Sequence, residues 1–335
     1  MRVVAVPDKL RGTASAGDVA AAIGRAATAA GWACDELPLA DGGEGTLDVL
    51  GGPNRTTTVT GPLGDPVEAE WRLDRRTAVI EMALASGLEL VGGPEGNDPV
   101  AASTTGTGEL IGTAVDSGAR RVLVGLGGSA TTDGGLGALR ALYPLHRLGG
   151  VELLVLCDVR TRFVDAAEVF APQKGATPAQ VELLRRRLER LGEVYLADYG
   201  VDVRSLDGAG AAGGLAGGLA VAGASLVPGF EALAEELDLP AVIDGADLVV
   251  TAEGFLDEQS FEGKVVGGVA GLAAAMDVPC VAIVGEVVDD LDPAGSKELE
   301  VMSLVERFGP DRAHHDTLGC IEAMAAELLA SASPT

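Results

Sequence analysis

The sequence is poor in aromatic and in basic residues. Phe, Trp and Tyr make up 3% of the 335 residues, and 24 Lys and Arg residues face 50 Asp and Glu residues, for a formal net charge of −26. Such a surface repels phosphate backbones, and few rings are available to stack on bases, so nucleic-acid binding is not expected. The same charge disfavours an anionic membrane surface. Any anionic substrate therefore needs a local basic pocket.

Histidine and cysteine are also scarce. The adjacent His314 and His315 lack the i, i+4 spacing of a helical metal site, and histidine-based acid–base chemistry is not expected. The four cysteines form no C-x-x-C pair, which predicts reduced thiols and a cytoplasmic protein. We expect no signal peptide, because the apolar run at the N-terminus is short. We expect no membrane span in the uncharged but glycine-rich stretch 208–230, which we interpret as a loop plus a buried helix of small residues.

Familiar nucleotide-binding motifs are missing or out of context. A G-x-x-x-x-G-K-[ST] P-loop is absent, since Lys264 is followed by Val265. Residues 208–213 spell G-x-G-x-x-G, but no βαβ pattern surrounds them, so nicotinamide binding is not expected. A nucleotide site in this chain is therefore of another kind.

Apolar residues and glycine are abundant, at 47% and 48 residues, which predicts an α/β fold built from small side chains. Helix and strand patterns alternate at both ends of the chain, whereas short strand-like runs separated by turns begin near residue 55. We predict a discontinuous Rossmann or flavodoxin-like parallel-sheet domain, residues 1–54 and 240–335. A second, mixed α/β domain is predicted to be inserted at residues 55–239.

The pattern also predicts individual elements. Strands are expected at 2–7, 34–39, 56–60, 67–73, 78–82, 121–126, 151–156, 247–251, 279–284 and 300–304. Helices are expected at 14–30, 109–117, 178–197 (after a Thr177 cap), 263–276 and 318–330.

Four loops that follow predicted strands combine glycine with charged or hydroxyl residues. They span residues 7–12, 41–45, 127–135 and 253–264. Ligands bind at the carboxyl ends of strands in open α/β sheets. Glycines let backbone N–H groups approach phosphate, hydroxyls donate to it, carboxylates hold Mg²⁺, and cations neutralise charge. Each loop alone could be a helix-starting turn, but together they predict a site for phosphate and a metal.

Two further segments follow the same logic less clearly. Asp158 follows a buried strand, and Gln173-Lys174-Gly175 mixes a cation with glycine. A structural and a functional interpretation are equally open for both.

The chain resembles the bacterial type I glycerate kinases along most of its length. Nine motifs occur in the same order: PDKLRGTASA (7–16), LPLADGGEGT (37–46), VTGPLGDPVEA (59–69), VIEMALASGL (79–88), STTGTGELI (103–111), GLGGSATTDGG (125–135), FAPQKGAT (170–177), GAGAAGGL (208–215) and AEGFLDEQSFEGK (252–264). The resemblance implies phosphorylation of D-glycerate by ATP with Mg²⁺, giving 2-phosphoglycerate or 3-phosphoglycerate. It also implies two α/β domains with the active site in the cleft between them.

On this resemblance we predict the residues of the site. The predicted catalytic residues are Lys9, Asp133, Asp257 as the candidate base, and Lys264. The predicted substrate-binding or ATP-binding residues are Asp8, Arg11, Gly127, Gly128, Ser129, Thr131 and Glu253. The predicted metal ligands are Asp41 and Glu44, with Asp133 as an alternative near Mg²⁺. The lysines are predicted to bind phosphate or the substrate carboxylate.

Alternatives remain open at this point. The chain could be a kinase of another small hydroxy acid, or a nucleotide-binding relative without turnover. Segment 136–150 is shorter than in the family, and Phe255 stands where a basic residue is more usual, which bears on specificity. The sequence does not fix the oligomeric state, and a homodimer stays open.

Overall fold

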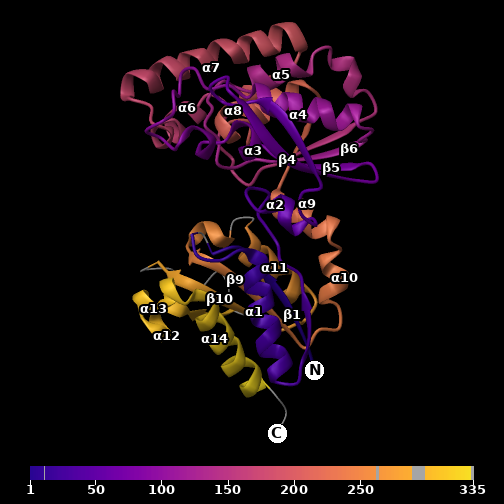
Figure 1. The fold of residues 1–335 in the computed structure, drawn as a ribbon, viewed down its shortest axis with the longest axis vertical. Helices are drawn as coiled ribbons and strands as arrows, with labels where there is room; N and C mark the ends of the chain where they lie inside the picture. Colours follow the sequence, from indigo (N-terminus) through magenta and orange to yellow (C-terminus); the bar gives the residue numbers. More distant parts are fainter. Residues whose placement is uncertain (11, 262–263, 289–298, 333–335) are drawn as a thin grey trace. The chain divides into compact units, whose positions relative to one another are not determined.

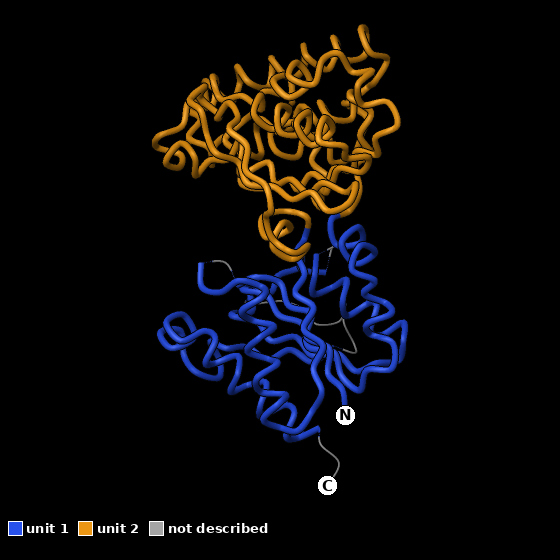
Figure 2. The backbone as a smooth tube through the Cα atoms, turned by 45° about the vertical axis from the view of Figure 1, so that its right-hand side comes forward, with its two compact units in different colours: residues 1–41, 229–335 blue, residues 42–228 orange. Residues whose placement is uncertain are grey.

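The structure is a computed structural model that describes residues 1–10, 12–261, 264–288 and 299–332. The chain divides into two units, residues 1–41 with 229–335 (unit 1) and residues 42–228 (unit 2) (Figure 2). Both are α/β, as Figure 1 shows. The α/β fold class is confirmed.

The junctions between the units fall earlier in the chain than the sequence prediction placed them, after residues 54 and 239. Gly45 and Leu47 donate backbone hydrogen bonds to Glu81, which ties the segment after residue 41 to unit 2. At the other junction, Phe230 lies against Gly268 of unit 1, so closely that a methyl group on that glycine would clash with the ring. Long-range contacts of this kind leave no local sequence signal.

Unit 1 contains a parallel sheet with strand order β11-β10-β9-β1-β2. Numbered along the unit, this is the 2-1-3-4-5 order of flavodoxin-like sheets. The strands are β1 (Arg2–Pro7), β2 (Ala33–Glu36), β9 (Leu248–Leu256), β10 (Cys280–Val287) and β11 (Leu299–Ser303). The helices are α1 (Ala16–Ala29), α9 (Gly229–Glu236), α10 (Leu239–Ile243), α11 (Val265–Ala275), α12 (Leu304–Phe308), α13 (Pro310–His315) and α14 (Thr317–Ala332).

Helices cover both faces of this sheet because its strands carry apolar side chains on both faces. On β10, Val281 and Ile283 belong to the core formed with α1 and α14. Ala282 and Val284 point the other way and pack with Val266 of α11. A strand buried on both faces is a continuous apolar run, which is why these strands were predictable.

Unit 2 contains a mixed sheet with strand order β3-β4-β5-β6-β7-β8. The first three strands are antiparallel, and β5 to β8 are parallel. The strands are β3 (Arg55–Thr60), β4 (Pro66–Asp74), β5 (Thr77–Glu81), β6 (Arg121–Gly125), β7 (Glu152–Leu156) and β8 (Ser225–Val227). The helices are α2 (Thr46–Val49), α3 (Ala83–Ser86), α4 (Thr105–Asp116), α5 (Leu136–Leu142), α6 (Ala166–Phe170), α7 (Pro178–Tyr199) and α8 (Ala211–Val221).

Two layers of helix lie on one side of this sheet. The core next to the strands contains residues of α4, α5 and α8, including Leu110 and Leu215. A second core, around Phe163 and Tyr195, joins α6 and α7 to α5. Helix α7 is therefore the outermost layer of unit 2 (Figure 1). The predicted helix at 208–230 is α8, but the three-residue strand β8 that follows it was missed.

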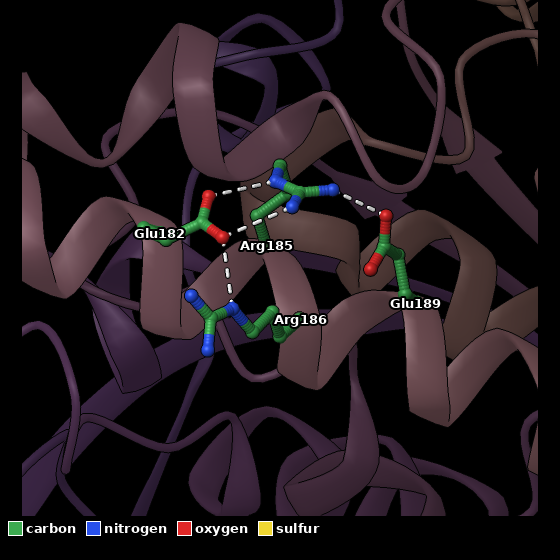
Figure 3. Close-up of polar contacts among 4 residues, drawn as sticks. All are labelled: Glu182, Arg185, Arg186 and Glu189. Atoms are coloured by element: carbon green, nitrogen blue, oxygen red, sulfur yellow. Dashed lines mark hydrogen bonds and ion pairs between the residues drawn. The ribbon is translucent and has the colours of Figure 1, made fainter.

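The outer surface of α7 holds a network of ion pairs (Figure 3). Glu182 accepts hydrogen bonds from Arg185 at 2.9 Å and from Arg186 at 2.8 Å, and Arg185 also pairs with Glu189. These hydrogen bonds lower the pKa of Glu182 to about 2. Thr177 caps the start of the helix, as predicted, and it forms a capping box with Gln180. Exposed pairs of this kind contribute little stability, and these arginines are occupied by partners within the helix.

None of the helices in the described part of the chain combines the length and the apolar character needed to cross a membrane.

Candidate active site

In unit 1, charged residues gather where the strand order reverses. Strands β1 and β9 are neighbours, and ligands bind at the carboxyl ends of such a pair in doubly wound sheets. Pro7 pairs with Ala252, and the Asp8 backbone N–H donates to the Ala252 carbonyl at 2.8 Å. Asp8 and Glu253, predicted from separate loops, are thus brought to the same end of the sheet. Lys9 follows Asp8 and donates its backbone N–H to the Asp8 carboxylate at 2.7 Å.

Glu253 is an unusual carboxyl group. Its residue is 7% exposed, and among the described residues its buried Oε1 atom finds no hydrogen-bond partner. Burial raises its pKa to about 7, and the nearby Asp8 and Asp257 carboxylates raise it as well. A hydrogen bond from Ser260 and the charge of Lys264 act in the opposite direction. A carboxyl group in this state can take up or release a proton near neutral pH.

Asp257 and Lys264 lie on the segment that follows β9. The Ser260 backbone N–H and hydroxyl donate to Asp257 Oδ1 at 2.9 and 3.2 Å, and the Asp257 N–H donates back to the Ser260 hydroxyl at 3.1 Å. Lys264, at the N-terminal cap of α11, places Nζ 3.9 Å from the same oxygen. The structure therefore brings the predicted residues Glu253, Asp257 and Lys264 together in unit 1. Arg11, also predicted here, lies outside the described residues.

In unit 2, two of the predicted loops lie side by side. The Leu126 backbone N–H donates to the Gly42 carbonyl at 3.1 Å. Gly127 lies so close to the loop 43–44 that a methyl group on it would sit 3.4 Å from the backbone nitrogen of Glu44. The two glycine-rich segments are thus brought together although about 80 residues separate them in sequence.

Glu81, at the end of β5, fastens the first of these loops and was missed as a site residue. Its Oε1 atom accepts the backbone N–H groups of Gly45 and Leu47 at 3.0 and 2.7 Å, and the residue is 7% exposed. A buried carboxylate at the start of α2 takes up N–H groups that would otherwise be free to bind phosphate. The sequence offered one signal, a charged residue at the end of an apolar strand.

The predicted site residue Asp133 is held by backbone and hydroxyl donors from two helix starts. Its carboxylate accepts the Thr104 N–H at 2.9 Å and the Thr104 hydroxyl at 2.9 and 3.1 Å. It also accepts the N–H groups of Gly135 at 3.0 Å and Gly137 at 3.1 Å, at the start of α5. The carboxylate therefore joins α4 to α5 and holds the end of the 127–135 loop.

Lys174 contacts residues 129–131 of this loop and is almost completely buried, at 3% exposed. Its Nζ donates to the Ser129 hydroxyl and to the Thr131 carbonyl, both at 2.7 Å. Burial lowers its pKa to about 7, although the charge of Asp133 opposes this. The predicted residues Ser129 and Thr131 are thus held by a lysine whose function the sequence left undecided.

The G-x-G-x-x-G stretch at 208–213 packs against the same loop. Gly213 has a φ of +68°, and a methyl group on it would lie 1.9 Å from the Thr131 carbonyl oxygen. The Gly134 N–H donates to the Gly213 carbonyl at 3.0 Å. Glycine is needed here because two backbones approach closely, which gives the motif a structural reason unconnected with a dinucleotide.

The predicted metal ligands Asp41 and Glu44 flank the first junction, Asp41 half-buried in unit 1 and Glu44 exposed in unit 2. Within the described residues, no group of three or more His, Cys, Asp or Glu side chains is placed to hold a metal ion. A Mg²⁺ site needs fewer protein ligands, because one or two carboxylates bind the ion and substrate phosphates and water complete its coordination shell. The chemistry of these two side chains fits that requirement.

Comparisons with known proteins agree on one family. A model described as the glycerate kinase family matches residues 3–143 and 144–332. The chain is 38% identical over 330 residues to the glycerate kinase of Bacillus subtilis (strain 168), covering 87% of this chain and 86% of the relative. It is 39% identical over 331 residues to the glycerate 2-kinase of Escherichia coli (strain K12), covering 87% of each.

A similar fold has been solved by crystallography. A crystal structure assigned to glycerate kinase 2 of Salmonella typhimurium LT2 superposes with a TM-score of 0.83 at 36% sequence identity. The match covers 99% of this chain and 98% of the other.

Proposed function

The chain belongs to the glycerate kinase family, and from this premise we propose that it transfers the γ-phosphoryl group of ATP to a hydroxyl group of D-glycerate. The proposed product is 2-phosphoglycerate, in line with the name of the Escherichia coli relative; 3-phosphoglycerate is the alternative. A cytoplasmic location and a homodimer stay predictions from the sequence.

One observation carries the proposal beyond the family match: a buried, protonatable carboxyl group lies near Lys264, at the end of the unit 1 sheet where Lys9 also lies. Phosphoryl transfer to an alcohol needs a group that accepts the hydroxyl proton and cations that balance the charge of the phosphates. Glu253 fits the first requirement, because its Oε1 has no partner among the described residues and its pKa is raised to about 7. Lys9 and Lys264 fit the second.

We infer that Glu253 is a stronger candidate for the base than Asp257. Asp257 Oδ1 already accepts two hydrogen bonds from Ser260 and faces Lys264, so its charged form has partners. Glu253, whose Oε1 has no partner among the described residues, gains more from a proton. In this mechanism Glu253 accepts the hydroxyl proton as the substrate oxygen attacks, and Asp257 orients Lys264.

The other predicted residues have supporting functions in this proposal. Asp41 and Glu44 would hold Mg²⁺, which would neutralise negative charge on the phosphates. Asp8 would bind substrate or ATP at the end of β1, and Arg11 remains proposed for the same function. In unit 2, Gly127 and Gly128 would let the loop approach an anionic group. Ser129 and Thr131 would bind the same group, and Asp133 would keep their loop in place.

A coupled assay of ADP release tests the proposal. Purified protein would be given Mg·ATP with D-glycerate, L-glycerate and a panel of small hydroxy acids, and the product identified by NMR. Turnover with D-glycerate supports the proposal, and the spectrum distinguishes 2-phosphoglycerate from 3-phosphoglycerate. Turnover only with another hydroxy acid, or none from folded protein that binds ATP, would contradict it.

A further inference from the structure

Lys174 is buried against the 127–135 loop and has no assigned function. It ends the short 3-10 helix Pro172–Lys174, and its ammonium group donates to the Ser129 hydroxyl and the Thr131 carbonyl at 2.7 Å each. An ammonium ion has three protons and no acceptor. Burying such a group is unfavourable, so its presence calls for a reason beyond filling space.

The hydrogen-bond chemistry of this pair sets the direction of the Ser129 hydroxyl. Because the ammonium can only donate, Ser129 Oγ must be the acceptor, and its own proton must point elsewhere. No backbone or side-chain acceptor for that proton exists among residues 1–10, 12–261, 264–288 and 299–332. Ser129 is also the least buried of the three, at 7% exposed against 3% for Lys174 and 0% for Thr131. The Thr131 hydroxyl also lacks a partner among the described residues but is fully buried, so the accessible free donor of the cluster belongs to Ser129.

The ammonium is not required merely to tie the loop down. The Asn97 side-chain amide donates to the Ala130 carbonyl at 3.0 Å and to the Lys174 carbonyl at 2.9 Å. A neutral side chain therefore already links the loop to the turn that carries Lys174. The positive charge adds something else: it keeps Ser129 Oγ as the acceptor of this hydrogen bond, so the hydroxyl proton points away from Lys174.

We propose that Lys174 is a positioning residue that keeps the Ser129 hydroxyl as a hydrogen-bond donor to an anionic oxygen of the bound substrate. The oxygen belongs either to a phosphate of ATP or to the carboxylate of the hydroxy acid. This inference rests on the proposed function, since it names the group that Ser129 contacts.

The state of Lys174 makes the arrangement sensitive to pH. Burial lowers its pKa to about 7, with the Asp133 carboxylate acting in the opposite direction. The neutral amine that forms above this pH can accept a hydrogen bond, so the Ser129 hydroxyl can turn inward and its donor is lost to the substrate. The contribution of Ser129 should therefore fall as the pH rises through about 7.

A double-mutant cycle on the full chain tests the inference. We expect Ser129→Ala and Lys174→Met each to lower kcat/KM by about 10-fold to 100-fold, the range for a hydrogen bond to a charged group. The double variant should lose no more than the more affected single variant, because Lys174 acts through Ser129. A raised KM for ATP identifies a phosphate oxygen, and a raised KM for D-glycerate identifies the carboxylate. Arg186→Met, which removes an exposed cation from α7, is the matched control.

Two outcomes would overturn the inference. In the first, the fold-losses in kcat/KM of the two single variants multiply in the double variant, which would mean that Lys174 acts independently of Ser129. In the second, Lys174→Met folds and its kinetics are unchanged. Circular dichroism and thermal unfolding report the fold of each variant. If Lys174→Met does not fold, Lys174→Arg decides, because arginine also only donates and does not lose its proton. It should remove the Lys174-dependent fall in kcat/KM above pH 7, and an unchanged fall would contradict the inference.

Failure of the proposed function would be seen separately, as absence of turnover by the wild-type protein. The same cycle is then measured by calorimetry with Mg·ATP and with D-glycerate as the probes. If both substitutions weaken the binding of the same ligand and their effects are not additive, the result supports the function of Lys174. Unchanged affinity for both ligands overturns it.

Discussion

Unit 1 buries a carboxyl group, Glu253, at the carboxyl end of its sheet, whereas unit 2 buries an ammonium group, Lys174, against the loop that follows β6. Glu253 Oε1 lacks a partner among the described residues, while Lys174 has two short hydrogen bonds. An acceptor without a partner is suited to receive a proton, and a donor with partners is suited to orient them. The comparison teaches that burial alone does not identify a catalytic group. Whether the buried group already has hydrogen-bond partners distinguishes a group that can react from a group that positions others.

The strongest test of this contrast is Glu253→Gln, which keeps the shape of the side chain and removes its basicity. We expect kcat to fall by about 100-fold to 10,000-fold, the range for loss of a general base, with the fold intact. Deprotonation of Glu253 should contribute a rise in activity with pH through about 7, opposite to the Lys174-dependent fall, and the variant should lack that rise. Steady-state kinetics between pH 5 and 9 would check both. If kcat falls more in Asp257→Asn than in Glu253→Gln, Asp257 and not Glu253 is the base.

In unit 2 the largest expected effect of removing a carboxylate is on stability. Asp133→Ala leaves the N–H groups of Thr104, Gly135 and Gly137 without their acceptor, so the free energy of unfolding should drop by about 3 kcal/mol. Urea unfolding of the variant measures the change. Loss of turnover without loss of stability would instead place Asp133 in direct contact with substrate or metal.

The two buried groups should give opposite dependences of stability on pH. The pKa of Glu253 rises from 4.5 to about 7 on folding, so the folded protein binds more protons between these values and loses stability as the pH increases across them. The pKa of Lys174 falls from 10.5 to about 7, so the unfolded chain binds more protons between these values and the folded protein gains stability as the pH increases.

Each unit of pKa difference corresponds to about 1.4 kcal/mol, so each window should span a few kcal/mol. Unfolding of the wild-type protein, Glu253→Gln and Lys174→Met across pH 4.5 to 10 would measure both. Glu253→Gln should remove the pH dependence of stability only between about pH 4.5 and 7, and Lys174→Met only between about pH 7 and 10.5. A change in the wrong window would show that another group is responsible.

The smallest effect is expected on the surface of α7. Glu182→Gln removes the acceptor shared by Arg185 and Arg186, yet these side chains are exposed and screened by water and salt. The melting temperature should shift by about 1 °C or less, and added salt should reduce the shift further. A loss comparable to that of Asp133→Ala would mean that exposed ion pairs matter as much as the capping carboxylates of unit 2.

Much of the fold could be predicted because its signals are local. The apolar run of β1 and the Thr177-Pro178 start of α7 occur where the sequence placed them. Strand β8 was missed because three residues, Ser225 to Val227, are too short for a periodic pattern. The junctions of the two units differ from the predicted domain bounds because contacts distant in sequence determine them.

The candidate site likewise has features that the local sequence shows and features that it does not. The glycine-rich loops were visible, since glycine and charge after a strand form a local pattern. The partners were not: Glu81 reaches back 36 residues to Gly45, and Lys174 reaches back 45 residues to Ser129. Such pairs are defined by the packing of strands and loops, which a single sequence does not display. The functions of the individual residues remain predictions for the same reason.

The burial of Lys174 makes this chain suitable for chemical footprinting. The sequence contains only four lysines, and three of them, Lys9, Lys174 and Lys264, lie in the segments of the candidate site. An acylating reagent at pH 8 finds Lys9 and Lys264 partly accessible, whereas Lys174 is a nucleophilic neutral amine shielded from solvent. Acylation of Lys174 must therefore wait for a local opening that exposes its Nζ atom. Peptide mass spectrometry would then read the rate of that local opening directly, with Lys9 and Lys264 as internal references.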